Sequence, residues 1–364
     1  MYIVLIIIAL IVVVGVIFLN QAKFGKNPSG ERLARIEKSA NYKNGQFQNL
    51  SETPQLTSDK SFAALMWDFL FVKKPNLRPE TEIPSVKTDL NSFSKDENVL
   101  VWLGHSAYFM QIDGKRFLID PTLVSASPVG FFNKPFKGAD IYSPKDIPNI
   151  DYLILTHDHW DHLDYETVMQ IKDRVGHIIT ALGVGEHLEY WGIPANKITE
   201  LDWYENTQIS DIFKLTALPV RHFSGRGLSP KKTLWVSFML ETPTQTVYIG
   251  GDSGYDDFYE KTAAQFPKID WAILENGQYD KGWKHIHFQP EEFPKLVKTL
   301  NPKNVLTFHN SKYALANHPW YEPLENAYQN AKNHNINLLT PKIGDIVYLN
   351  AENQQFGKWW EGVR

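Results

Sequence analysis

The chain has 364 residues, enough for one large domain or two ordinary ones, and its hydrophobic fraction of 43% can fill a sizeable core. The formal net charge is only -4 and no long basic run occurs, so the totals do not indicate a nucleic-acid partner. The sequence contains no cysteine, which excludes disulfides and thiolate metal ligands.

An unbroken apolar run from Tyr2 to Leu19 opens the chain. As a helix it would be about 27 Å long, close to the hydrocarbon thickness of a bilayer. A cleaved signal peptide is the main alternative, but no basic residue precedes the run and Asn20-Gln-Ala22 is a poor cleavage site. We therefore predict a single-pass membrane anchor over residues 1–19. Basic residues follow only on its carboxyl-terminal side, so the positive-inside rule places the rest of the chain in the cytoplasm.

The sequence predicts that residues 20–96 form a basic juxtamembrane linker and an amphipathic extension. Residues 21–50 carry six basic and two acidic side chains, which fits a tether lying on anionic headgroups or a linker packed on the following domain. Four apolar residues after Asp59 fall at helical spacing: Phe62, Leu65, Met66 and Phe69. That helix could lie on a membrane, roof a lipid-binding cleft or pack on the domain.

From Asn98 onward short strands and turns begin, and later helices and strands alternate to the end. The first predicted strands are Val99 to Leu103, Tyr108 to Ile112 and Lys115 to Ile119, the last after a hairpin-type turn at Asp113-Gly114. Helices are predicted near Val184 to Trp191, Pro290 to Leu300 and Glu322 to His334. We assign residues 97–364 to one domain.

Three histidines and three aspartates crowd into Thr-His-Asp-His-Trp-Asp-His-Leu-Asp, residues 156–164. An apolar strand-like run precedes this stretch, and Asp164 can cap a helix that runs to about Arg174. A divalent metal offsets the desolvation and repulsion of such a cluster. Imidazole and carboxylate ligands suit zinc, manganese or iron, and zinc is the default expectation. The alternative is a polar surface loop that is rich in histidine.

The pattern His157-x-His159-x-Asp161-His162 resembles the signature of the metallo-β-lactamase fold superfamily of metal-dependent hydrolases. The later motifs of that superfamily also appear here in order, as Leu-Pro-Val-Arg-His222, Tyr-Ile-Gly-Gly-Asp252-Ser-Gly and Val-Leu-Thr-Phe-His309-Asn. The resemblance implies an α/β (α+β) fold, a four-layer αββα sandwich in which two mixed sheets pack face to face with helices outside.

Within the superfamily the sequence resembles N-acyl-phosphatidylethanolamine-hydrolysing phospholipase D and its bacterial relatives over roughly residues 97–325. The residues that carry this resemblance are Trp102-Leu-Gly-His105-Ser, Asp120-Pro-Thr-Leu, Ser127-Pro, Gly251-Asp252-Ser-Gly-Tyr255 and His287-Phe-Gln-Pro-Glu-Glu292. The anchor and the linker have no counterpart in this resemblance.

The resemblance implies two Zn²⁺ ions per chain. Its implied ligands are His157, His159 and His222 for one ion, Asp161, His162 and His309 for the other, and Asp252 as the bridge. Asp161 or Asp252 would also orient a hydroxide held between the ions. His287 is the candidate proton donor or phosphate contact, and His285 could replace it. His105 would orient a ligand or be a structural histidine.

The expected function is therefore a zinc-dependent phosphodiesterase acting on a phospholipid, by phospholipase D type cleavage of N-acyl-phosphatidylethanolamine to phosphatidate and an N-acylethanolamine. Its expected partners are the phospholipid and the membrane, with no nucleic acid, and the sequence leaves the oligomeric state open. Two alternatives remain: a metal-dependent hydrolase of another ester, such as a lactone or a nucleotide phosphodiester, and a non-catalytic envelope protein that retains the fold.

Overall fold

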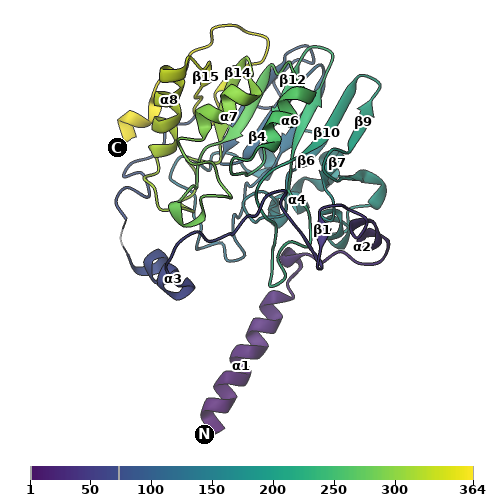
Figure 1. Cartoon of the computed structure of the whole chain (residues 1–364), viewed down its shortest axis with the longest axis vertical. Coiled ribbons are helices and arrows are strands. Elements are labelled where there is room, and N and C mark those ends of the chain that lie inside the picture. The colour runs from purple at the N-terminus through teal and green to yellow at the C-terminus, as the bar shows by residue number, and fades with distance from the viewer. Residues whose placement is uncertain (1, 73, 364) are drawn as a thin grey trace.

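The computed structural model describes residues 2–72 and 74–363 and contains two seven-stranded mixed sheets (Figure 1). In the first sheet the strand order is β16-β3-β4-β5-β6-β7-β8, and in the second it is β15-β14-β13-β12-β11-β10-β9. Strands β5 to β8 run parallel to one another, as do β12 to β15, while the remaining pairs are antiparallel. The predicted pair of mixed sheets is confirmed.

The strands of the first sheet are β3 (Val99–Gly104), β4 (Ala107–Ile112), β5 (Lys115–Ile119), β6 (Ile150–Leu155), β7 (Val175–Ala181), β8 (Ile198–Leu201) and β16 (Ile346–Tyr348). Those of the second are β9 (Asn206–Ser210), β10 (Phe213–Pro219), β11 (Val236–Glu241), β12 (Thr246–Ile249), β13 (Trp271–Glu275), β14 (Asn304–Phe308) and β15 (Leu338–Leu339). The α-helices of the same region are α4 (Tyr165–Ile171), α5 (Gly185–Tyr190), α6 (Phe258–Gln265), α7 (Phe293–Leu300) and α8 (Glu322–His334).

The alternation of side chains along β13 shows how the layers form. Ile273 belongs to the large cluster of buried residues between the two sheets, whereas its neighbours Ala272 and Leu274 belong to a second cluster with residues of α6 and α7. Figure 1 shows α6, α7 and α8 in front of the strands of this sheet. Each fully buried aliphatic side chain in these layers contributes about 1.5–3 kcal/mol.

The predicted elements around the nine-residue stretch are present. β6 ends at Leu155, and α4 begins at Tyr165 with Asp164 as its cap, because the Asp164 side chain accepts a hydrogen bond from the amide of Glu166. The helix continues as a 3₁₀ turn to Arg174. The stretch therefore lies in a loop between a buried strand and a helix.

Strand ends gather the other predicted residues at the same edge. β10 ends at Pro219 shortly before His222, β12 ends at Ile249 before Asp252, and β14 ends at Phe308 next to His309. Because β12, β13 and β14 are parallel, their carboxyl ends meet at one edge of the sheet. This topology brings together residues that lie far apart in the sequence.

The amino-terminal helix α1 (Tyr2–Leu19) projects from the domain, and none of its residues is buried (Figure 1). Its length and mean hydropathy of 3.5 suffice to cross a membrane, and a signal sequence has the same properties.

The following segment packs on the domain. It contains a 3₁₀ turn at Ala22–Phe24, α2 (Gly30–Ile36) and a small hairpin of β1 (Tyr42–Lys43) and β2 (Gln46–Phe47). Ile36 and Phe47 are fully buried in the core cluster, and Arg32 forms ion pairs with three glutamates of the domain. Of the two interpretations open for this segment, the structure favours the packed linker. The domain boundary at residue 97 stays a prediction.

The predicted helix after Asp59 is α3 (Phe62–Phe71), capped by the Ser61 hydroxyl. The side chains of Phe62, Leu65, Met66 and Phe69 lie outside the described residues. On the same helix, the side chains of Trp67 and Phe71 are exposed.

Candidate metal centre

Three predicted ligands form one compact group of imidazoles. His157 and His159 come from the loop after β6, and His222 comes from the loop after β10. Nδ1 of His159 lies 2.9 Å from Nε2 of His157 and 3.1 Å from Nε2 of His222. Three ring nitrogens therefore converge within ligand distance of one point, although His157 and His222 are more than sixty residues apart.

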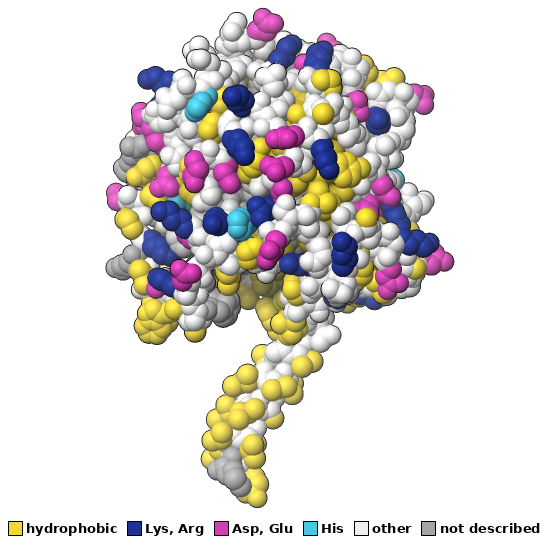
Figure 2. Space-filling view, in the orientation of Figure 1, with side chains coloured by type: hydrophobic (Ala, Val, Ile, Leu, Met, Phe, Trp, Pro, Cys, Tyr) yellow, Lys and Arg dark blue, Asp and Glu magenta, His cyan; other side chains and the backbone are white. Residues whose placement is uncertain are grey.

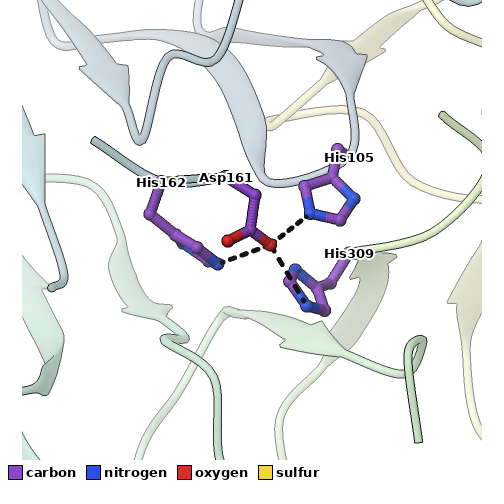
Figure 3. Close-up of side chains that lie close together, drawn as sticks. All are labelled: His105, Asp161, His162 and His309. Atoms are coloured by element: carbon purple, nitrogen blue, oxygen red, sulfur yellow. Dashed lines mark hydrogen bonds and ion pairs between the residues drawn. The ribbon is translucent and has the colours of Figure 1, made fainter. Parts of the chain in front are cut away.

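A second group surrounds Asp161, as Figure 3 shows. Its Oδ2 atom lies 3.8 Å from Nε2 of His162 and 3.9 Å from Nε2 of His309. The same oxygen lies 2.8 Å from Nε2 of His105, which projects from the turn between β3 and β4. His105 thus holds the carboxylate of Asp161 in place. Of the two roles expected for His105, this contact fits the orientation of a ligand.

Asp252 lies between the two groups. Its Oδ2 atom is 3.1 Å from Nε2 of His162, 3.2 Å from Nε2 of His309 and 3.7 Å from Nε2 of His222. Its other oxygen, Oδ1, is buried with no hydrogen-bond partner among the described residues. A buried carboxylate oxygen without a partner is costly, and a bridging position between two cations would satisfy it.

Hydrogen bonds behind the imidazoles fix which nitrogen faces the centre. Nδ1 of His222 lies 2.8 Å from the carbonyl oxygen of Ile286, which can only accept, so this nitrogen carries the proton and leaves Nε2 with a free lone pair. Nδ1 of His162 likewise donates to the carboxylate of Asp120 at 2.8 Å. Such partners hold a ligating imidazole in one tautomer and one orientation.

The other two aspartates of the nine-residue stretch have structural roles. Asp158 accepts hydrogen bonds from the amide of Gly225 at 2.6 Å and from the hydroxyl of Thr233 at 2.8 Å. Asp164 caps α4 and also accepts from the amide of Val124. The sequence pattern therefore combines ligand candidates with residues that hold the loop to its neighbours.

The electrostatics of the site favour a cation. Burial and the surrounding imidazoles keep the pKa values of His157, His222 and His309 well below the usual range, so these rings stay neutral. Burial raises the pKa of Asp252 to about 6. Burial opposes protonation of His162, yet the carboxylates of Asp252 and Asp161 hold its pKa well above the usual value. Neutral imidazoles offer lone pairs, and the nearby carboxylates offer negative charge that the side chains around them only partly neutralise. A divalent metal binds such a set of donors.

A cavity of about 410 Å³ opens onto this centre. The ligand candidates His159, Asp161, His222, Asp252 and His309 form part of its lining, and so does His287. His285 is not among the lining residues, so the structure favours His287 as the residue that could meet a substrate. Two amides and five apolar side chains complete the lining: Gln55, Gln278, Leu56, Phe223, Trp283, Ile286 and Leu315.

His287 is held from behind by a buried carboxylate. Its Nδ1 atom lies 3.3 Å from Oε1 of Glu275, at the end of β13. Glu275 is fully buried and accepts hydrogen bonds from the amides of Ser253 and Phe288. Burial raises its pKa well above the usual value.

Three residues that support the site were not assigned a role from the sequence. They are Asp120 behind His162, Glu275 behind His287, and Ser106, whose hydroxyl lies 2.8 Å from Nδ1 of His309. Asp120 carries a usable signal, since it stands directly after a buried strand and before a proline. Ser106 lies in the turn between β3 and β4, and Glu275 ends β13; both are common residue types, and only the structure shows which side chains they contact.

The chain is similar to known proteins in sequence and in fold. A family model described as "Beta-lactamase superfamily domain" matches residues 115–310. An uncharacterized protein of Mycobacterium tuberculosis is 30% identical over 339 residues, which cover 89% of this chain and 88% of that protein. An N-acyl-phosphatidylethanolamine-hydrolyzing phospholipase D of Caenorhabditis elegans is 29% identical over 60% of this chain and 65% of its own length. A metallo hydrolase of Ignicoccus hospitalis has the same fold, with a TM-score of 0.51 and 17% identity over 69% of this chain and 97% of that one.

Proposed function

Because the chain belongs to the beta-lactamase superfamily, in which metal-dependent hydrolases are found, we propose that it is a two-zinc phosphodiesterase acting on a phospholipid. The specific reaction that we propose is the phospholipase D type hydrolysis of N-acyl-phosphatidylethanolamine. The proposed ligands are His157, His159 and His222 for one ion, Asp161, His162 and His309 for the other, and Asp252 between them. The similarity to an N-acyl-phosphatidylethanolamine-hydrolyzing phospholipase D supports the choice of substrate.

The observation that carries the proposal is the composition of the cavity. One part of its lining consists of imidazoles and carboxylates that can hold cations, and the rest is largely apolar, with Leu56, Trp283 and Ile286 among the side chains. A phospholipid presents the same two chemistries, an anionic phosphodiester next to apolar chains. A soluble nucleotide would leave the apolar wall without a partner.

Bound zinc would supply Lewis-acid stabilisation of the phosphoryl oxygens and would make water a better nucleophile. The chain's own residues do the positioning. His105 holds Asp161 at 2.8 Å, and the carbonyl of Ile286 holds His222, so that both ligand atoms face the cavity. In the hydrolysis, the water oxygen forms a bond to phosphorus and releases one proton, the bond from phosphorus to the N-acylethanolamine oxygen breaks, and that oxygen takes up one proton. We propose that His287, oriented by Glu275, gives that leaving oxygen its proton.

We also propose that α1 anchors the enzyme as a single span and that the hydrolase domain lies in the cytoplasm. The exposed apolar surface of α1 and the basic residues that follow it support this arrangement.

The test is mass spectrometry of the products formed when the full chain, reconstituted with zinc, meets N-acyl-phosphatidylethanolamine in mixed micelles. We expect phosphatidate and an N-acylethanolamine from the unmutated chain and from Asp211→Asn, a matched control in an exposed turn. Asp252→Asn should form neither product. Two zinc ions per chain without lipid turnover would overturn the lipid substrate, and lactones and nucleotide phosphodiesters would be assayed next.

A further inference from the structure

Large apolar side chains are exposed on two loops of the domain. Leu228, in the loop after His222, is 83% exposed, and Phe131 and Phe132, in the long loop after β5, are 67% and 65% exposed. The ring centroids of the two phenylalanines lie 4.5 Å apart, so the two side chains form one exposed apolar cluster. Scattered apolar residues are ordinary on a protein surface, but residues gathered on one face indicate a partner.

Both loops lie beside the base of α1. Leu228 lines a cavity of about 230 Å³ together with Leu19, the last residue of α1, and Phe24. On the other loop, the carbonyl oxygen of Pro128 accepts a hydrogen bond of 2.6 Å from Nζ of Lys23. The exposed side chains therefore flank the point where the apolar helix enters the domain.

Helix α3 continues the same face. Figure 1 places α3 at the end of the domain from which α1 projects, and Figure 2 shows apolar side chains along this lower edge at the base of α1 and on the side where α3 lies. The exposed rings of Trp67 and Phe71 lie 4.5 Å apart. The segment after α3 reaches back to the phenylalanine loop, since Arg78 donates a hydrogen bond to the carbonyl of Lys134.

The junction after α1 is fixed to the domain rather than hinged. The guanidinium of Arg226 donates to the carbonyl of Lys23 through Nε at 3.1 Å and Nη2 at 2.9 Å. The indole of Trp191 donates to the carbonyl of Ala22 at 2.7 Å, and the ring of Phe24 packs edge-on against Trp160. If α1 spans a membrane, these contacts therefore fix which side of the domain faces that membrane.

We propose that this face, formed by Leu228, Phe131, Phe132, Trp67 and Phe71, is a second membrane contact that inserts into the surface of the bilayer spanned by α1. A lipid bilayer is the occupant that fits, because Leu228 shares a cavity lining with Leu19 at the end of an apolar helix of spanning length, and the phenylalanine loop and α3 lie at the same end of the domain. Aromatic and aliphatic tips of this kind partition into the interfacial layer of a membrane. A second copy of the chain fits less well, because it would have to cover this face while only α1 of each copy entered the bilayer.

Two chain segments connect this face to the lining of the cavity at the candidate metal centre. The loop that carries Leu228 at its tip carries Phe223 in the cavity lining, and the segment that carries Leu56 in the lining leads into α3. These two segments would link a lipid-facing surface to the cavity in which we propose that the lipid is cleaved. This consequence rests on the proposed function, whereas the membrane contact itself does not.

The absence of cysteine from the sequence makes the test direct. Single-cysteine variants of the full chain at Leu228, Phe132 and Trp67 are labelled with an environment-sensitive dye and reconstituted into vesicles of phosphatidylcholine and phosphatidylglycerol. Ile212 is the matched control, because it is an exposed aliphatic residue in the turn just before β10, at the opposite end of that strand from His222. A cysteine at Val12 in α1 reports insertion of the span.

We expect nitroxide lipids labelled near the headgroup to quench the dyes at Leu228, Phe132 and Trp67 at least twofold more than the dye at Ile212. Equal quenching at all four sites, with Val12 quenched by deeper nitroxides, would overturn the proposal. Quenching that appears only at a high protein-to-lipid ratio would also overturn it in favour of a second copy. A dye at Val12 that no nitroxide lipid quenches would show that α1 does not enter the bilayer, and the proposal would then be refuted as well. No lipid turnover is needed, so failure of the phospholipase reaction gives a different result.

Discussion

Replacing Asp120 by asparagine should weaken metal binding without removing any proposed ligand. The carboxylate of Asp120 is buried and accepts three hydrogen bonds, from the amide and hydroxyl of Thr156 at 2.8 and 2.6 Å and from Nδ1 of His162 at 2.8 Å. An asparagine can keep the bond from the amide through its carbonyl oxygen. Its NH₂ group then faces Nδ1 of His162, and two donors cannot share that contact.

The size of the effect follows from the tautomer. With an NH₂ group opposite Nδ1, the neutral ring of His162 is more stable with its proton on Nε2, the nitrogen that faces Asp252 at 3.1 Å. That proton occupies the lone pair needed for a metal. Losing the residue behind a ligating histidine typically costs 10- to 100-fold in metal affinity, or about 1.4–2.7 kcal/mol.

The assay is zinc competition against a chromophoric chelator, with the unmutated chain and Asp211→Asn as references. We expect the affinity of one site per chain to fall by 10- to 100-fold in Asp120→Asn, and the affinity of the other site to change less. Circular dichroism separates this outcome from unfolding. Equal zinc affinities in a folded Asp120→Asn protein would refute the assignment of His162 as a ligand.

Three further predictions concern stability. Chelation should lower the melting temperature, because a ligand that binds only the folded state at 1,000 times its dissociation constant stabilises that state by about 4 kcal/mol; calorimetry with and without EDTA measures this. Arg32→Met should lower the free energy of unfolding in urea by about 1–3 kcal/mol, because it leaves three glutamates without their shared partner in a site that is largely, not fully, buried. Burial raises the pKa of Glu325, but hydrogen bonds from Gln329, Trp360 and Lys358 outweigh burial and lower it from 4.5 to about 2. This carboxylate therefore stabilises the fold fully above about pH 4.5 and loses its effect as the pH falls toward 2, and Glu325→Gln should remove that acid dependence from the unfolding midpoint.

Each of these predictions has its own control. A melting temperature that EDTA leaves unchanged in zinc-loaded protein would contradict metal binding by the folded chain. Arg35 is the reference for Arg32, since it pairs with only one glutamate and is 45% exposed, so Arg35→Met should cost less than about 1 kcal/mol. Equal losses for both arginines would show that the buried ion pairs do not hold the linker. A Glu325→Gln variant that keeps the full acid dependence would assign that dependence to other carboxylates.

Features that depend on neighbouring residues in the chain could be predicted from the sequence. The strand before residue 156, the cap at Asp164 and the start of α4 at Tyr165 follow from local apolar runs and capping chemistry. The hairpin turn at Asp113-Gly114 also forms, with φ angles of 47° and 76°, because glycine and aspartate tolerate the left-handed region. The spacing of the histidines within the loop belongs to the same class of local information.

Features that depend on the packing of distant segments could not be predicted in this way. His105 and Asp161 are separated by 56 residues and meet only because the β3–β4 turn and the loop after β6 share one edge of the first sheet. The docking of the linker through Arg32 and Phe47 likewise depends on contacts more than 150 residues away. A local pattern of charge gives no sign of such a partner, so tether and packed linker were equally compatible with the sequence.

One side chain joins the junction after α1 to the loop of proposed metal ligands, and this limits how far the two can move independently. The guanidinium of Arg226 is buried, lies 4.1 Å from the ring centroid of Trp160 and donates to the carbonyls of Asp158 and Leu163, while it also holds the carbonyl of Lys23. Trp160 stands between two proposed ligands in the sequence. A displacement of the junction after α1 therefore either breaks these bonds or shifts the loop that carries the ligands. The segment outside the phospholipase resemblance thus supports the loop of proposed ligands, and deleting it should disturb zinc binding as well as the proposed membrane attachment.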